Sequence, residues 1–267
     1  MINKFSKDYV ITGSSSVMLF GENTIDWSQI TDTDRLSYEF DFYQYGYKCK
    51  TYTDKSSQLL IHTLHPLCEK RNENCGLISL SKRGCMNSTV RFLSQITTED
   101  DKKYISPMLF TNSICNMPNA LASIEYNMKG FGNHLYGSRN DSVEAIWQAC
   151  AALEDELADE IVVAAFEAKL EEFDDKSIVR RKNVVCQKEE GASAVRITTK
   201  RYANDRDEDS LFLIKGFYFN QKIEEIEQEL KKESCKLIIG NGISVYEEMK
   251  QLDVQIEQSL KFADFAK

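Results

Sequence analysis

Hydrophobic and polar residues alternate along this chain in segments that predict strands and helices in turn. Residues 8–18 predict a buried strand that ends in a Gly/Ser turn, and residues 75–80 predict a second buried strand. Apolar residues recur at helical spacing over 56–70 and again over 87–96, with a glycine turn at Gly84 before the second helix. This order of elements is typical of an α/β fold, in which helices pack on a central sheet.

The most informative stretch lies between residues 106 and 167. A turn-rich entry leads to an apolar helix over 118–128, a short strand over 133–137, a long helix over 141–158 and then a buried strand over 160–166. The short strand passes directly into the long helix. Enzymes with α/β folds often hold a nucleophile at such a turn, with the helix N-terminus behind it. Here the turn reads Tyr-Gly-Ser-Arg-Asn-Asp and contains no cysteine.

The remainder of the chain suggests a division into two units. Residues 190–197 predict another strand, and the highly charged run 200–209 is the best candidate for a linker. We therefore expect a first unit over 1–199 and a smaller second unit over 210–267. The second unit contains only two predicted strands and two predicted helices.

Two motifs in the central stretch resemble those of the β-ketoacyl synthases, thiolase-fold enzymes that condense acyl units on acyl carrier protein. The entry motif of that family is similar to residues 106–113, which read SPMLFTNS. The family's nucleophile strand begins after a glycine and ends in a Thr-Ala-Cys-Ser-Ser-Ser-like turn; residues 130–132 and 137–142 occupy the same places. The resemblance implies an α/β fold with thiolase-like α/β/α layers and a mixed sheet, whose second half is incomplete here.

The same resemblance implies that the catalytic residues of the family are missing. Arg139 falls where the active cysteine would be, and Asn241 falls where the first catalytic histidine would be. The only histidines are residues 62, 65 and 134, none of them downstream of the central stretch. Condensation needs a thiolate to carry the acyl group and donors to stabilise the oxyanion. We therefore expect no ketosynthase activity and no catalytic residue in this chain.

A further implication of the resemblance is a partner subunit. Some bacterial polyketide and polyene pathways use a heterodimer in which an active ketosynthase pairs with a chain-length factor, a relative that has lost its cysteine. We expect this chain to be such a subunit in fatty acid, polyene or polyketide biosynthesis, with acyl carrier protein as an indirect partner. In ketosynthase dimers the strand before the nucleophile turn pairs across the two-fold axis. The candidate interface residues are therefore Asn133, His134, Leu135 and Tyr136.

The candidate binding residues are Ser138, Arg139 and Asn116. If the chain is a chain-length factor, Arg139 faces the interior near the dimer interface, where it would cap or block the tunnel for the growing chain. In the alternative interpretation, Arg139 merely pairs with a nearby carboxylate such as Asp141.

Two other functions stay open at the level of the sequence. One is a small enzyme that processes acyl thioesters with other residues, such as Cys115 or Ser138. Cys115 and His134 are the only plausible nucleophile–base pair near the turn. The other is a scaffold that binds acyl carrier protein without chemistry. The net charge of −9 argues against the scaffold, because acidic carrier proteins are repelled by an acidic surface.

Composition narrows the remaining classes of function. The chain is 42% hydrophobic and 28% charged, which is typical of a globular protein with a real core. It has no basic stripe with interleaved aromatic residues and no apolar run long enough to span a bilayer, so we expect neither a nucleic acid nor a membrane as partner. The eight cysteines lack C-x-x-C pairs, which indicates free thiols and favours a cytoplasmic location. We expect no cofactor and no metal, because His62 and His65 share a helix face without an obvious third ligand.

Overall fold

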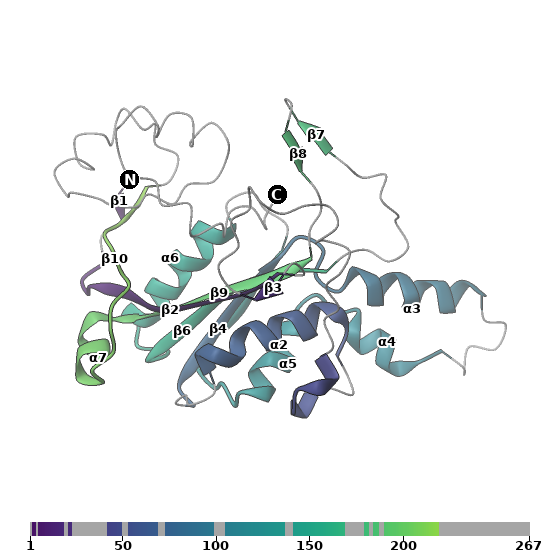
Figure 1. Cartoon of the computed structure of the whole chain (residues 1–267), viewed down its shortest axis with the longest axis horizontal. Helices are drawn as coiled ribbons and strands as arrows, with labels where there is room; N and C mark the ends of the chain where they lie inside the picture. The colour runs from purple at the N-terminus through teal and green to yellow at the C-terminus, as the bar shows by residue number, and fades with distance from the viewer. Residues whose placement is uncertain are drawn as a thin grey trace.

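The computed structural model describes residues 2–3, 5–18, 21–22, 42–49, 53–68, 73–98, 105–136, 141–168, 179–181, 184–186 and 190–218. These residues form a mixed sheet with helices on both faces (Figure 1). Asn241 and the helices and strand expected after residue 219 lie outside the described residues. The division into units over 1–199 and 210–267 therefore stays a prediction.

The central sheet is made of strands that the hydrophobic pattern largely predicts. Its members are β2 (Tyr9–Met18), β3 (Gly21–Glu22), β4 (Cys75–Ser81), β5 (Gly132–Tyr136), β6 (Glu160–Glu167), β9 (Gly191–Thr199) and β10 (Phe212–Ile214). Two short pairs lie outside this sheet: β1 (Ile2–Asn3) with β11 (Phe217–Tyr218), and β7 (Val179–Arg181) with β8 (Val184–Cys186).

The helices predicted before residue 199 are present, with shifted ends. The described helices are η1 (Phe42–Gln44), α2 (Lys55–Cys68), α3 (Met86–Thr98), α4 (Pro107–Asn112), α5 (Met117–Glu125), α6 (Asp141–Glu154) and α7 (Lys200–Asp205). Helix α6 ends four residues earlier than predicted, and α4 replaces part of the turn-rich entry. In the described part of the chain, no helix combines the length and apolar character needed to cross a membrane.

The strand order is β10-β2-β9-β6-β4-β5, with β3 paired to β2. Strands β5 and β6 both run parallel to β4, whereas β9 runs antiparallel to its neighbours β6 and β2. Among the described strands β5 pairs only with β4, so it forms one edge of the sheet. The mixed sheet predicted from the family resemblance is thus confirmed.

Two apolar clusters fill the space between the sheet and its helices. Successive residues of β6 alternate between them: Val162, Ala164 and Phe166 pack in the cluster that contains α2, and Ile161 and Val163 pack in the cluster that contains α6. Figure 1 shows α6 on one face of the sheet and α2 with α5 on the other. This burial on both faces explains why β6 reads as a continuous apolar run rather than as an alternating one.

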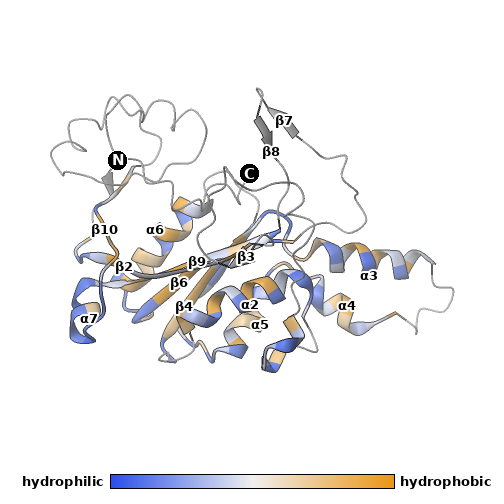
Figure 2. Ribbon diagram, viewed as in Figure 1, coloured by the Kyte–Doolittle hydropathy of each residue, from blue (hydrophilic) through white to orange (hydrophobic). Residues whose placement is uncertain are grey.

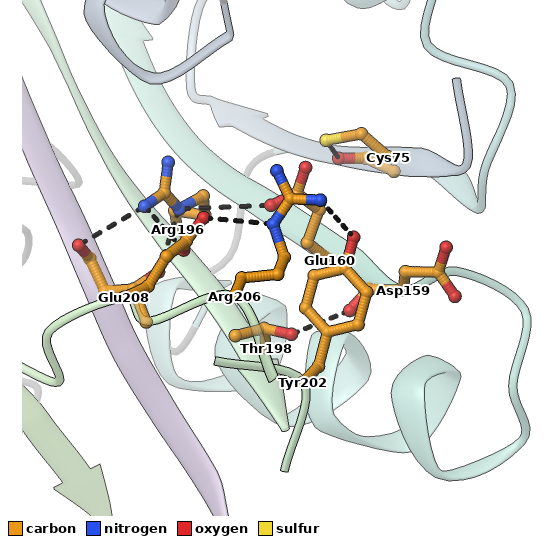
Figure 3. Close-up of polar contacts among 10 residues, drawn as sticks. Cys75, Asp159, Glu160, Arg196, Thr198, Tyr202, Arg206 and Glu208 are labelled. Atoms are coloured by element: carbon orange, nitrogen blue, oxygen red, sulfur yellow. Dashed lines mark hydrogen bonds and ion pairs between the residues drawn. The ribbon is translucent and has the colours of Figure 1, made fainter. Parts of the chain in front are cut away.

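Where the sequence predicted a charged linker over 200–209, the structure has helix α7, and the chain then rejoins the sheet. Thr199 Oγ1 accepts a hydrogen bond from Tyr202 N (3.2 Å) and so caps the helix. Strand β10 then pairs antiparallel with β2. An ion pair between Arg196 Nη2 and Glu208 Oε2 (3.0 Å) connects the charged run to β9 (Figure 3). Glu208 of this run is therefore a counter-ion of a buried arginine.

Candidate functional site

The parallel strands β4, β5 and β6 end at the same edge of the sheet, with Ser81, Tyr136 and Glu167 as their last residues. Ligands of open α/β sheets bind beyond the carboxyl ends of such strands. The predicted nucleophile turn connects β5 to α6 at this edge. Ser138 and Arg139 belong to it and lie outside the described residues, so their roles stay predictions.

A buried glutamate holds the turn that follows β4. Glu167 Oε1 accepts hydrogen bonds from Lys82 N and from Ser81 Oγ (3.3 Å), and Arg83 Nε lies 3.9 Å from Glu167 Oε2. Burial raises the pKa of the Glu167 carboxyl, although the Lys82 amide and the Arg83 guanidinium act in the opposite direction. The contacts of this carboxylate are all with the protein's own turn, which gives Glu167 a structural role.

Gly84 forms contacts with several elements at this edge. Its φ of +51° lies in the left-handed region that glycine favours, which confirms the predicted glycine turn. Gly84 N donates to Ser81 Oγ (2.6 Å), and Ser56 Oγ at the start of α2 donates to Gly84 O (2.7 Å). A Cβ at this position would lie 3.5 Å from the Tyr136 ring and 3.7 Å from Cys115 O. The turn therefore brings together α2, β4, β5 and the entry to α5.

Asp54 is a partly buried carboxylate near this edge that sequence reasoning missed. It accepts hydrogen bonds from Ser57 N (2.9 Å) and Ser57 Oγ (2.7 Å), and Ser88 Oγ donates to its other oxygen (3.2 Å). Burial raises the pKa of the Asp54 carboxyl, and the hydrogen bonds from the serines oppose that shift. Because Asp54 directly precedes α2 and bonds the amide of its first turn, it acts as the cap of that helix.

The cysteines near this edge differ in accessibility. Cys85 is buried at the start of α3, and burial together with the nearby Asp54 carboxylate raises the pKa of its thiol to about 11. A thiol of this kind is a poor nucleophile near neutral pH. Cys115 is exposed. Six cysteines are free thiols, as predicted, although Cys115 is not buried: Cys49, Cys68, Cys75, Cys85, Cys115 and Cys150.

The described histidines are engaged within the fold. His134 Nδ1 lies 2.8 Å from Ser79 Oγ, and its ring stacks on Phe166 at 5.9 Å between centroids. His62 Nδ1 lies 2.8 Å from the Tyr47 hydroxyl. Among the residues that the structure describes, no group of His, Cys, Asp and Glu side chains has an arrangement that could hold a metal ion. The pairing of Cys115 with His134 as nucleophile and base stays a hypothesis.

The predicted interface residues all lie on the edge strand β5. Leu77 N donates to Phe131 O (2.9 Å), so the alternation of a parallel ladder directs the backbone of Asn133 and Leu135 toward β4. The backbone groups of His134 and Tyr136 therefore point away from the sheet. Asn133 Oδ1 accepts the outward His134 N–H (2.8 Å), and the Tyr136 side chain is exposed. The outward N–H of His134 is thus already bonded within its own strand, and Tyr136 ends the strand with an exposed side chain.

Asn116, the one described member of the predicted binding residues, lies at the same edge. It is exposed, precedes α5 and makes no capping hydrogen bond with its side chain. It directly follows Cys115, whose carbonyl lies near Gly84. Tyr136 and the residue before Asn116 therefore both lie near the Gly84 turn.

Comparison with solved structures gives several thiolase-like neighbours. The ishigamide ketosynthase/chain length factor matches with a TM-score of 0.56 and 16% identity over 73% of this chain and 63% of that one. A ketosynthase in complex with its chain length factor from Xenorhabdus doucetiae matches with a TM-score of 0.52 and 15% identity over 72% and 79%. A type II polyketide synthase acyl carrier protein in complex with its ketosynthase gives a TM-score of 0.65 and 16% identity over 92% and 81%. At these identities the similarity shows the fold.

The family follows from the sequence of the chain itself. No curated protein matches it as a relative. The model of the β-ketoacyl synthase N-terminal domain, however, matches residues 54–209, which is more than half of the chain and includes the whole of the carboxyl edge described above. The first of the structures named above is longer than this chain, which covers 63% of it. The chain belongs to the family of β-ketoacyl synthase N-terminal domains.

Proposed function

We propose that this chain is a non-catalytic, chain-length-factor-type subunit that pairs with an active β-ketoacyl-acyl carrier protein synthase. The observation that carries the proposal is the residue at the nucleophile turn, where the family overlay has Arg139 in place of cysteine. A guanidinium is permanently charged and cannot form a thioester. The structure supports the overlay because β5 and α6 flank that turn as the family pattern requires.

The proposed contact with the ketosynthase runs along the edge of β5. The strand over 133–136 would pair with a strand of the ketosynthase, because an edge strand gains hydrogen bonds when another strand is added to it. Ser138, Arg139 and Asn116 would lie beside this contact, with Arg139 at the end of the tunnel for the growing chain. Acyl carrier protein would be bound mainly by the ketosynthase, because the net charge of this chain is −9.

The pathway and the location belong to the same proposal. Similarity to structures with ketosynthase, chain length factor and polyketide synthase in their titles supports a place in polyketide, polyene or fatty acid biosynthesis. The six free thiols named above support a reducing compartment, for which we propose the cytoplasm.

The proposal is tested by co-expressing the tagged chain with a ketosynthase encoded beside it. We expect the two proteins to co-purify in a 1:1 ratio. Tyr136→Glu should prevent this, because it places a charge at the proposed contact. Tyr43→Glu is the matched control, since Tyr43 is an exposed tyrosine on η1, and it should leave co-purification unchanged. A wild-type chain that never co-purifies with the ketosynthase would contradict the pairing.

A second prediction concerns chemistry. The purified chain should remain unacylated when it is incubated with acyl-carrier thioesters, because the nucleophile turn has no thiol. Arg139→Cys alone should also lack condensation activity, since a thiol without its imidazole partners lacks most of the stabilisation of the transition state. Intact-protein mass spectrometry would measure both. A stable acyl adduct on any wild-type cysteine would show that the chain is an enzyme after all.

A further inference from the structure

Two cysteines from separate parts of the sequence lie at the Gly84 turn. Cys85 directly follows Gly84 and precedes α3, and Cys115 lies in the loop between α4 and α5. A Cβ at Gly84 would lie 3.7 Å from Cys115 O, so this loop passes close to the backbone that carries Cys85. Figure 2 shows α3 leaving the body of the protein, beside the apolar strands of the sheet, where α4 returns to it. The fold therefore brings the two cysteines to one place.

A hydroxyl group joins the two segments that carry these cysteines. Thr89 Oγ1, in the first turn of α3, lies 3.2 Å from Cys85 O and 3.3 Å from Ser113 O, and it donates toward both carbonyl oxygens. Ser113 follows the last residue of α4 and lies two residues before Cys115. The shared hydrogen bond therefore holds the loop that contains Cys115 against the start of α3, next to Cys85.

Tyr136 lies beside both thiol groups. A Cβ at Gly84 would lie 3.5 Å from the Tyr136 ring, so the ring lies against the same turn. Burial is the main cause that raises the pKa of the Tyr136 hydroxyl, and the charges that the Cys115 and Cys85 thiols acquire on ionisation raise it further. Burial and the Asp54 carboxylate raise the pKa of the Cys85 thiol, and the Cys115 thiol adds to that shift. Each sulfur therefore lies within electrostatic reach of the other sulfur and of the same hydroxyl.

The two thiols differ in what can reach them. Of the six free cysteines named above, only Cys115 is exposed, so a reagent dissolved in the solvent reaches it directly. Cys85 is 2% exposed, and with a pKa of about 11 its thiol forms little thiolate near neutral pH. An accessible thiol beside a second, sheltered one is the arrangement of a modification site with a resolving cysteine.

We propose that Cys115 is a site of reversible S-thiolation by low-molecular-weight disulfides such as oxidised glutathione, and that Cys85 resolves the adduct. The Cys115 thiolate attacks one sulfur of the small disulfide, whose S–S bond breaks, so that one half leaves as a thiolate and the other half stays on Cys115. Cys85 then loses its proton to the solvent, and its thiolate attacks the Cys115 sulfur. The mixed disulfide breaks, the second small thiolate leaves, and a Cys85–Cys115 disulfide remains. Two protein thiols are thus oxidised, and one small disulfide is reduced to two thiols.

The two steps should differ in rate, because only the second step needs a thiolate at Cys85. Below the pKa of about 11, the fraction of Cys85 in the thiolate form increases about tenfold for each pH unit. We therefore expect the Cys115 adduct to accumulate near pH 7. Its conversion to the internal disulfide should be about 100-fold faster at pH 9 than at pH 7.

The test incubates the purified whole chain with oxidised glutathione and follows each cysteine by mass spectrometry with peptide mapping. In the wild type we expect one glutathionyl group on Cys115, followed by its loss as the Cys85–Cys115 disulfide forms, and dithiothreitol should reverse both changes. Cys85→Ala should retain the glutathionyl group on Cys115. Cys115→Ser should abolish both products, and it should melt like the wild type because its side chain is exposed. Cys150 is the internal control: it is fully buried and should stay unmodified.

Each other outcome contradicts a specific part of the proposal. If the wild-type adduct on Cys115 persists at pH 9 as it does in Cys85→Ala, Cys85 is not a resolving cysteine. If oxidised glutathione leaves Cys115 unmodified, or if Cys115→Ser gains the same modification at Cys85, Cys115 is not the site. A conversion rate that does not change between pH 7 and pH 9 would exclude attack by the Cys85 thiolate. None of these outcomes depends on a ketosynthase, because the chain is measured alone.

Discussion

Replacing Arg196 with alanine should lower the free energy of unfolding by ~3–5 kcal/mol, because it removes the guanidinium from a buried ionic cluster. Arg196 is nearly buried on β9. Its Nε donates a hydrogen bond to Thr12 Oγ1 (2.8 Å) and lies 4.0 Å from Glu160 Oε2. Its Nη2 lies 3.0 Å from Glu208 Oε2 (Figure 3). Glu160 is 1% exposed, so its carboxylate cannot gain hydration in exchange. The expected loss is a large part of the ~5–15 kcal/mol that stabilises a typical domain.

Urea unfolding of Arg196→Ala, compared with that of a control variant, would measure this loss. Arg206→Ala is the control: Arg206 is 40% exposed and pairs with the same Glu208 at 3.3 Å, so its removal should cost less than about 1 kcal/mol. Arg196→Met combined with Glu160→Gln should recover most of the loss. Wild-type stability of Arg196→Ala would contradict the buried cluster as a source of stability.

Gly130→Ala should both destabilise the protein, by about 3 kcal/mol, and weaken partner binding at least tenfold, because it would push the edge strand off the sheet. A Cβ at Gly130 would lie 2.8 Å from the Cys75 carbonyl carbon and 2.9 Å from Gly76 N. At Gly76, a Cβ would lie 2.5 Å from Phe131 O. These neighbours are backbone atoms, which cannot yield as a flexible side chain would. The two glycines therefore allow the segment before β5 to approach β4.

The neighbouring glycine of the same motif provides the control. A Cβ at Gly132 would lie 3.9 Å from its nearest neighbour, Leu77 O, which is an ordinary contact. Gly132→Ala should therefore be neutral or stabilise the fold by about 0.5 kcal/mol, through the lower entropy of the unfolded chain. Thermal melting and the Kd for the ketosynthase would compare the two variants. If Gly130→Ala matches Gly132→Ala in both measurements, the close approach has no energetic importance.

Local periodicity predicts the elements of this fold because it reports burial directly. The apolar run over 160–166 predicts β6 almost to the residue, since β6 is covered on both faces. Strand order, in contrast, does not follow from local periodicity. The neighbours of β9 are set by contacts between residues far apart in sequence, which no local pattern records.

The misinterpreted segments have identifiable causes. Ser106-Pro107 is typical of a turn, but Pro107 begins helix α4. Proline also favours the first position of a helix, because its missing N–H is not needed there. The charge of residues 200–209 suggests a linker, but Thr199 caps helix α7 there and Glu208, after the helix, pairs with the buried Arg196.

The roles of the candidate site residues stay predictions, and only the place of some of them in the fold is seen. The β5 residues lie at a sheet edge, which the family pattern implied. Asp54 had a signal that was overlooked, because an Asp followed by Ser three residues later before an apolar period is typical of a helix start. No sequence signal indicates the role of Glu167, because its contact with Lys82 spans 85 residues. The sequence alone does not distinguish such a carboxylate from other polar residues at the ends of strands.

The pairing of β2 with β9 sets an order of events during synthesis. Nine pairs join residues 9–18 to residues 191–199, which are roughly 180 positions apart in the chain. Strands β4, β5 and β6 with helices α2, α5 and α6 can therefore assemble on the ribosome before β9 exists. Strand β2, the first long strand to be made, has only the two-residue strand β3 beside it until β9 emerges. In this interval the nascent chain exposes most of an unpaired strand, which favours aggregation.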